Sequence, residues 1–443
     1  MKNEKLIGVA LCVFFCMFLG SCSKNDAEGN KPKSDYDPKK PITLTTFYPD
    51  SGIYLEKVML NGSNFGTDPE KIRVYFNQKK AAVVGSTGER MYVLAPRLPG
   101  DTVVISVAIG TDSVVYDKTF RYFSSTTVNT IAGNGNHADY QDGDLTQSII
   151  QPWFICVDKE DNIFVMTRSR GPDGNTASAN MHITRIDEEA NELVTIARDV
   201  IANAPAADPV TGVISFPTET TVGSFCTLDP KEMWGVRYRE MKWPPEGDRP
   251  AQGYKHSMVV NPSDGYIYTR YYHGHIVKID PRTYEVETIF KTPQGDSFGL
   301  TFTPDKPNIL YISFIHNAGV NSHSICTIDV TNPENTFQKI SGPTNGGHRD
   351  GPISVAQFRN PAQIFSDADG NIYVADTDNH CIRRITPDHF VETVLGMPGT
   401  SGWKDGGKEE ALFNRPMGLG ISKDGAIYVA DNGNARVRKL SIN

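Results

Sequence analysis

Short runs that alternate apolar and polar residues, separated by clusters of Gly, Pro, Asn and Asp, occur along most of this chain. Two such stretches near the C-terminus repeat each other: residues 360–385, NPAQIFSDADGNIYVADTDNHCIRRI, and residues 415–440, RPMGLGISKDGAIYVADNGNARVRKL. Asp376 aligns with Asp431, an offset of 55 residues. A fixed period of this size predicts a repeat architecture, because one unit alone cannot bury its apolar face.

Each repeat predicts three short strands. A run of small residues leads to an Asp-Gly turn, then to Ile-Tyr-Val-Ala, and then to Ile-Arg-Arg-Ile or Val-Arg-Lys-Leu. The Asp-Gly pair favours a hairpin because the turn needs positive φ. Each repeat is therefore expected to form an antiparallel blade, and several blades form a propeller. The pattern resembles the NHL-repeat family, whose repeats read P-x-G-L-A-V-D-x-x-G-N-I-Y-V-A-D-x-x-N-x-R-I.

The propeller is predicted to span residues 125–443 and to begin in mid-blade. Residues 127–132 resemble the run after the third strand of the fifth blade, so we expect them to complete the last blade and close the ring. The less regular blades are placed by first strands at 153–157, 225–228, 257–260 and 299–302. Six blades are predicted, and seven stays an alternative because residues 202–216 are long and irregular enough to hide strands.

Residues 41–124 form a separate set of short alternating strands, which predicts an immunoglobulin-like all-β sandwich. The segments YPDSG, LNGSNFG and LAP within it resemble the IPT/TIG family. That resemblance implies a spacer or interaction domain. We expect its aromatic residues to lie in the sandwich core rather than on a sugar-binding surface.

The N-terminus predicts an export signal. Lys2 and Lys5 precede an apolar run, residues 6–19, that is followed by Leu-Gly-Ser-Cys. The ending resembles a bacterial lipobox, which implies that residues 1–22 are a lipoprotein signal peptide and Cys22 the lipidated residue. A plain secretory signal with an incidental cysteine is the alternative. Residues 23–40 are polar and charged, as expected of a flexible tether.

Composition fits an exported globular protein. The net charge is −8 and no basic run follows the signal, which argues against nucleic acid as a partner. No C-x-x-C or Cys/His spacing occurs, so the cysteines after residue 22 are expected to be buried thiols. These cysteines are Cys156, Cys226, Cys326 and Cys381.

In a propeller the loop before each first strand and the loop after each second strand open on one face, around the central channel. The other blades do not carry an aspartate at the position of Asp376; the residues there are Thr167, Arg237, Tyr271 and Phe314. Aromatic rings stack on the apolar faces of sugars, and Arg pairs with carboxylates, so this face predicts a ligand-binding site. The alternative is drift, in which aromatics plug the channel and arginines pair with acids of neighbouring blades. The candidate ligand-binding residues are Trp153, Arg168, Arg237, Tyr238, Tyr254, His256, Arg270, Tyr271, Tyr272, His273, Phe298 and His316.

Asp376 and Asp431, each in a D-x-x-N motif, are expected to cap turns rather than to catalyse. Residues 367–371, DADGN, superficially resemble a calcium loop but lack its later ligands, so they are interpreted as a hairpin turn. His273 and His275 would point the same way if they lay on a strand, which would supply half of a divalent-metal site. No third ligand is identifiable, and no cofactor is predicted.

The resemblance to IPT/TIG–NHL lipoproteins of Bacteroidetes implies an outer-membrane lipoprotein, facing the cell exterior and held to the membrane only by its lipid anchor. The implied ligand is a glycan, handled by a neighbouring outer-membrane transport complex. An enzyme is the rival hypothesis, a carbohydrate hydrolase or lyase that uses His256, His273, Arg237 and Glu240. A third hypothesis is a protein-interaction scaffold.

Overall fold

The computed structural model describes residues 36–77, 79–98, 101–123, 126–137, 140–168, 181–219 and 221–442. The predicted signal peptide, Cys22 and residues 23–35 of the predicted tether lie outside these described residues. Within the described part of the chain, no helix is long and apolar enough to cross a membrane. The chain divides into two compact units, residues 1–96 with 102–122, and residues 97–101 with 123–443.

The first unit is an all-β domain of eight strands in the order β1-β3-β6-β5-β4-β7-β8-β2. The strands are β1 (Thr43–Tyr48), β2 (Ser51–Gly52), β3 (Lys57–Ser63), β4 (Ile72–Phe76), β5 (Lys79–Ser86), β6 (Arg90–Leu94), β7 (Asp101–Ile109) and β8 (Asp112–Tyr122). Alternate side chains face a common core, where Phe47 and Phe76 each pack edge-on against a neighbouring ring. The expectation that the aromatics of this domain lie in the core is wrong for Tyr48 and Tyr92, which are exposed.

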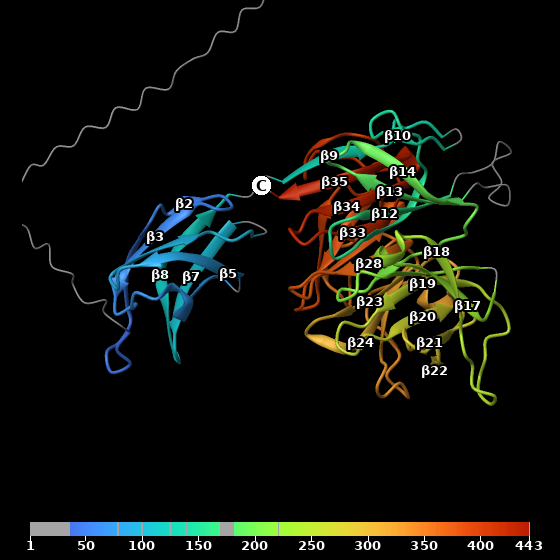
Figure 1. Cartoon of the computed structure of the whole chain (residues 1–443), viewed down its shortest axis with the longest axis horizontal. Coiled ribbons are helices and arrows are strands. Elements are labelled where there is room, and N and C mark those ends of the chain that lie inside the picture. The colour runs from blue at the N-terminus through green and yellow to red at the C-terminus, as the bar shows by residue number, and fades with distance from the viewer. Residues whose placement is uncertain are drawn as a thin grey trace, which may run out of the picture. The chain divides into compact units, whose positions relative to one another are not determined.

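The second unit is a propeller of six antiparallel sheets (Figure 1), which confirms the predicted number of blades. Blade one contains β10 (Gly143–Asp144), β11 (Pro152–Val157), β12 (Ile163–Arg168), β13 (Met181–Asp187) and β14 (Glu192–Arg198). Blade two contains β15 (Ala206–Ala207), β16 (Ile214–Pro217), β17 (Ser224–Leu228) and β18 (Val236–Glu240). Blade three contains β19 (Lys255–Val260), β20 (Ile267–Tyr271), β21 (His275–Ile279) and β22 (Val286–Lys291). Blade four contains β23 (Gly299–Thr303), β24 (Lys306–Phe314), β25 (Ser324–Asp329) and β26 (Gln338–Lys339).

Blades five and six follow the two repeats. Blade five contains β27 (Gly351–Pro352), β28 (Pro361–Ser366), β29 (Ile372–Asp376), β30 (Cys381–Ile385) and β31 (Phe390–Leu395). Blade six contains β32 (Gly406–Gly407), β33 (Pro416–Ile421), β34 (Ile427–Asp431), β35 (Arg436–Ile442) and β9 (Thr126–Ala132). Single 3-10 turns are η1 (Pro69–Lys71), η3 (Pro230–Glu232), η4 (Gly319–Asn321), η5 (Thr377–Asn379) and η6 (Asn432–Asn434).

The ring closes as predicted. β9 pairs antiparallel with β35, with Val128 opposite Leu440, so the start of the propeller completes its last blade. Figure 1 shows β9 beside β35, in the sheet that continues through β34 to β33, although more than 280 residues separate β9 from these three strands in sequence. This pairing gives both terminal strands of the propeller a neighbour and removes two free sheet edges.

The predicted placement of blade two is wrong. Residues 225–228 belong to its third strand, β17, rather than to its first, and the first two strands are β15 and β16. They lie in the stretch that was thought to hide strands of a seventh blade. β15 is only two residues long and is flanked by prolines, so its sequence carries almost no alternating pattern. Arg237 and Tyr238 consequently lie on β18, the outermost strand of the blade.

Apolar side chains fill the spaces between neighbouring blades. The four described cysteines lie in this core as free, buried thiols, as predicted. Burial raises the pKa of the Cys326 thiol to about 11, so this sulfur is protonated and unreactive at neutral pH.

Candidate functional site

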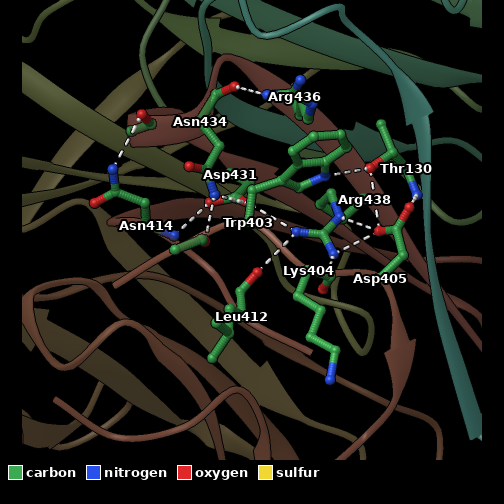
Figure 2. Close-up of polar contacts among 12 residues, drawn as sticks. Thr130, Trp403, Lys404, Asp405, Leu412, Asn414, Asp431, Asn434, Arg436 and Arg438 are labelled. Carbon is green, nitrogen blue, oxygen red and sulfur yellow. Dashed lines mark hydrogen bonds and ion pairs between the residues drawn. The ribbon is translucent and has the colours of Figure 1, made fainter. Parts of the chain in front are cut away.

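Asp431 in blade six is the centre of a buried polar network (Figure 2). Its carboxylate accepts hydrogen bonds from the backbone N–H of Asn414 at 2.7 Å, from Nδ2 of Asn434 at 2.8 Å and from Nη1 of Arg438 at 2.9 Å. The Arg438 guanidinium, also fully buried, donates to Asp405 from Nε at 3.0 Å and from Nη2 at 2.6 Å. Two backbone carbonyl groups take its remaining N–H groups. Every charge in the network therefore has a partner, as burial requires.

Blade five repeats the network. Asp376 accepts from the backbone N–H of Arg359 at 2.7 Å, from Asn379 at 2.8 Å and from Arg383 at 2.8 Å, and Arg383 in turn donates to Asp350. Burial raises the pKa of Asp376 to about 6, with the guanidinium opposing the rise, so the carboxyl is ionised at neutral pH. Asp376 therefore caps a backbone N–H group, as predicted. The backbone group that is capped precedes the first strand, whereas a turn between the second and third strands was expected.

Asp350 and Asp405 supply the second carboxylate of these networks. The sequence assigned them no role beyond a turn. Each lies at the Asp-Gly step before its blade and reaches an arginine 33 residues further on, at the third strand. The full motif is thus Asp-Gly, then Asp-x-x-Asn, then Arg, in which the second aspartate and the arginine are fully buried and the first aspartate is about 40% exposed.

Blades one to four lack this unit. By strand register, the residues at the Asp376 position are Thr167, Thr218, Tyr271 and Phe314. At the third-strand position of Arg383, the register places Thr184, Cys226, Val277 and Cys326. None of these eight side chains carries a charge at neutral pH, so charged residues near these positions pair in other ways.

One such pairing joins blades one and two. Arg168, the last residue of the second strand of blade one, donates from Nη2 to Glu219 Oε1 of blade two at 3.2 Å. Asn203 donates to the same oxygen at 2.9 Å. The Arg168 guanidinium lies 5.0 Å from the ring centre of Trp153. Burial opposes ionisation of Glu219, but the Arg168 charge and the Asn203 amide outweigh it and lower the pKa of the carboxyl.

A line of rings continues from Trp153 towards blade four. Trp153 lies 6.2 Å from Phe154, Phe154 lies 5.6 Å from Phe298, and Phe298 lies 4.8 Å from His256, all measured between ring centres. His256 Nδ1 lies 3.2 Å from a carboxylate oxygen of Asp296. Burial lowers the pKa of His256, while Asp296 and Glu219 oppose the shift. Asn203, which donates to Glu219, also donates to the backbone carbonyl of Lys255, the residue before His256, so the ion pair and the ring line are neighbours.

The partly exposed residues of this set are called the rim cluster. Side-chain exposure is 15% for Arg168, 25% for Glu219, 11% for His256 and 20% for Asp296, so each reaches solvent from a largely buried position. The rim cluster consists of Trp153, Arg168, Glu219, His256, Asp296 and Phe298. It offers two aromatic faces, one ion pair and one imidazole–carboxylate pair, the groups with which a protein binds a polar ligand that has apolar faces.

The structure brings together four of the predicted site residues, Trp153, Arg168, His256 and Phe298, and separates the others from them. Arg270 and Tyr271 are buried: Arg270 donates to Thr292 and Ser297, and Tyr271 donates to the carbonyl of Val222 at 2.7 Å. Burial gives them a structural role and takes them out of reach of a ligand. Both were predicted at the rim because second strands end there, but the Arg270 side chain turns to the loop at residues 292–297 and the Tyr271 side chain turns to blade two.

The remaining candidates lie outside the rim cluster. Tyr254, Tyr272 and His273 stand in loops of blade three, and His316 is exposed beside Asn360. The expectation that Arg237 and Tyr238 line the rim is wrong, because β18 is an outer strand. Arg237 pairs there with Glu232 at 2.8 Å, and the alternative catalytic residue Glu240 lies exposed on the same strand.

His273 and His275 do not form half of a metal site on one strand. His273 lies in the turn before β21 and His275 begins that strand, so the two do not share the alternation that would align them. Among the described residues, no group of three or more His, Cys, Asp or Glu is placed to hold a metal ion.

Three members of the site were missed by the sequence analysis, namely Asn203, Glu219 and Asp296. Asn203 and Glu219 flank the two hidden strands of blade two, so no pattern located them. Asp296 lies two residues before Phe298, in a loop already recognised as part of the face, and a search for carboxylates in that loop would have found it.

A cavity of about 260 Å³ lies between the first strands of blades one to five, along the channel of the propeller. Phe298 lines it at the end that carries the rim cluster, and Pro209, Pro262 and Pro304 line it at the other. Gln363 bridges strands within it, accepting from the N–H groups of Ile155 and Leu419. The channel is thus narrow and mostly apolar, so a large ligand would rest on the rim rather than pass through.

Comparisons with known proteins agree with this architecture. Residues 42–122 match the model of the IPT/TIG domain, and residues 358–385 and 413–440 match that of the NHL repeat. The chain therefore consists of an IPT/TIG-type β domain followed by a six-bladed propeller that carries NHL repeats.

Among solved structures, a protein of unknown function from Bacteroides thetaiotaomicron VPI-5482 is similar over 93% of this chain and 100% of its own, with a TM-score of 0.76 and 23% identity. An auxiliary nutrient binding protein from the same organism is similar over 92% of this chain and 99% of its own, with a TM-score of 0.58 and 22% identity. Likeness at this level of identity shows the shared fold.

Among characterised relatives, the protein SUPPRESSOR OF QUENCHING 1 of Arabidopsis thaliana is 28% identical over 170 residues. That match covers 36% of this chain and 16% of the plant protein. The chain thus spans less than a fifth of that relative, so the likeness concerns repeats rather than a whole protein.

Proposed function

We propose that this protein is an outer-membrane lipoprotein, anchored through Cys22 and facing the cell exterior, that binds a glycan at the rim cluster for an adjacent nutrient-uptake complex. The observation that carries the proposal is the rim cluster itself, where aromatic faces and paired polar groups stay partly exposed in the blades that depart from the NHL pattern. The fold shared with an auxiliary nutrient binding protein supports it.

The chemistry of the rim cluster suits a sugar. Trp153 and Phe298 offer ring faces for the C–H faces of pyranoses, and Glu219 and Asp296 can accept hydrogen bonds from hydroxyl groups. Arg168 is held between the Trp153 ring and Glu219, so its position is fixed before a ligand arrives. Fixed binding groups lower the entropic cost of binding.

The test is calorimetric titration of the protein with a panel of plant, fungal and host oligosaccharides. We expect Trp153→Ala to weaken binding of the best ligand by about tenfold or more, as truncation of a central aromatic does. Trp403→Ala is the matched control, because Trp403 is 52% exposed on blade six, and we expect its affinity to stay within about twofold of the native value. Equal effects of the two substitutions would refute the rim cluster as the site.

The His256–Asp296 pair favours one second candidate, a carbohydrate hydrolase or lyase. A neutral imidazole oriented by a carboxylate is the arrangement of a general base. Incubation of the same panel with the protein, followed by assays for new reducing or unsaturated ends, separates the two functions. Binding without product supports the binding protein, and product formation that His256→Ala abolishes supports the enzyme.

A further inference from the structure

The IPT/TIG domain carries an aromatic row that the propeller site does not involve. On β1, β3 and β6, Phe47, Leu60 and Met91 face the core and are buried. Side chains alternate along a strand, so the residues next to these three point outward. They are Tyr48, Met59 and Tyr92, which pair directly across the three strands.

The row is open to solvent. Tyr48 is 72% exposed and Tyr92 is 52% exposed. On the far side of Tyr92 the register places Gly85, and a Cβ built there meets no atom within 4 Å, so none of the residues that the structure describes covers that end. A shallow pocket of about 520 Å³ lies along the row. Its lining residues are Tyr48, Pro49, Ser51, Glu56, Lys57, Met59 and Tyr92.

The spacing of the rings is set by the sheet. Tyr48 and Tyr92 lie two strands apart, and neighbouring strands are separated by about 4.8 Å, so the two positions are roughly 9–10 Å apart. One hexose in an extended chain advances by about the distance between two neighbouring strands. The two rings therefore match every second sugar of a chain that crosses the strands, with Met59 beneath the sugar between them.

Polar residues border the row on both sides. Two positions along the strands, Thr46, Asn61 and Arg90 form a parallel row on the same face. Asn61 donates from Nδ2 to Thr46 Oγ1 at 3.0 Å, and the side-chain oxygen Oδ1 of the same amide can accept a hydrogen bond from a ligand. On the other border, Lys57 is exposed. An apolar strip with hydrogen-bonding groups along both edges complements a sugar chain, whose ring faces are apolar and whose edges carry hydroxyl groups.

We propose that this tyrosine row is a second glycan-binding surface, for an extended polysaccharide of equatorially linked pyranoses laid across β1, β3 and β6. Such chains are flat and present C–H faces to both sides, so they can stack on both rings at once. The surface does not depend on the rim cluster.

The test uses the full chain in pull-down assays with insoluble cellulose and insoluble mannan, with starch granules as the axially linked comparison. We expect native protein to bind cellulose or mannan more than starch, and Tyr48→Ala with Tyr92→Ala to reduce the bound fraction by about tenfold or more. Tyr48→Phe with Tyr92→Phe should keep most of the binding, because the ring faces remain. Tyr238→Ala is the matched control, since Tyr238 is 66% exposed on an outer strand of the propeller.

Three results would overturn the proposal. The first is no binding of native protein to cellulose or mannan, and the second is an equal loss of binding in the double alanine variant and in Tyr238→Ala. The third is sedimentation of the native protein as a dimer and of the double alanine variant as a monomer. The last result would assign the row to a second copy of the chain. Trp153→Ala separates this proposal from the rim cluster, because it should weaken oligosaccharide binding at the propeller by about tenfold or more while leaving polysaccharide pull-down intact. A common unfolding midpoint for all variants confirms that the fold is unchanged.

Discussion

Blades five and six differ from blades one to four in the residue at the end of the second strand. In blades five and six this residue is a fully buried aspartate, and its arginine partner lies on the third strand of the same blade. In blades one and two the charged residues lie one position later and pair across blades, as Arg168 does with Glu219. The comparison teaches that the most regular residues of this propeller pair within single blades, whereas Arg168 and Glu219, which depart from the pattern, pair between blades and stay partly exposed.

The largest expected effect is a loss of stability caused by a substitution in blade five, one of the two regular blades. Arg383→Met should destabilise the propeller by about 3–5 kcal/mol, because it leaves the buried carboxylate of Asp376 without its charged partner. Urea unfolding followed by tryptophan fluorescence measures the loss. Arg282→Met is the matched control, since Arg282 pairs with Asp280 at 79% exposure and should cost no more than about 1 kcal/mol. A loss below about 1 kcal/mol for Arg383→Met would show that the network is not what holds the blade.

A smaller loss of stability is expected from a substitution between the irregular blades one and two. Arg168→Met removes an ion pair whose members are 15% and 25% exposed, so water can still reach Glu219, and the loss should be about 1–2 kcal/mol. The same substitution should weaken glycan binding more than Arg383→Met does. Arg237→Met, which breaks a surface pair on an outer strand, should leave both quantities unchanged. If Arg168→Met costs as much stability as Arg383→Met, the contrast between the two sets of blades fails.

The fold was predictable wherever the chain repeats itself. The offset between Asp376 and Asp431, the Asp-Gly turns and the match of residues 127–132 to a fourth strand were enough for six blades and for ring closure. Blade two was misplaced because β15 spans two residues beside prolines and lacks alternation. The predicted number of blades was still correct, because the two strands wrongly taken as the first and second of blade two both belong to that blade.

The site was less predictable, and for two physical reasons. Because the strands of blade two were assigned two positions too early in the blade, Arg237 was predicted at the rim although it lies on the outer strand. The same error left Glu219, which does lie at the rim, out of the prediction. Tyr271 was assigned correctly to the end of its strand, but no pattern reveals that its hydroxyl reaches a carbonyl group inside the core. On the IPT/TIG domain, Tyr48 and Phe47 are adjacent aromatics, and only the register shows which of them faces solvent.

The most direct test of the central claim is hydrogen–deuterium exchange with and without the oligosaccharide that binds best in the calorimetric panel. We predict slower exchange on binding in the segments at residues 151–154, 216–219, 254–257 and 295–298, which carry the rim cluster except for Arg168, with blades five and six unchanged. Protection confined to blades five and six, or spread evenly over all six blades, would contradict the account.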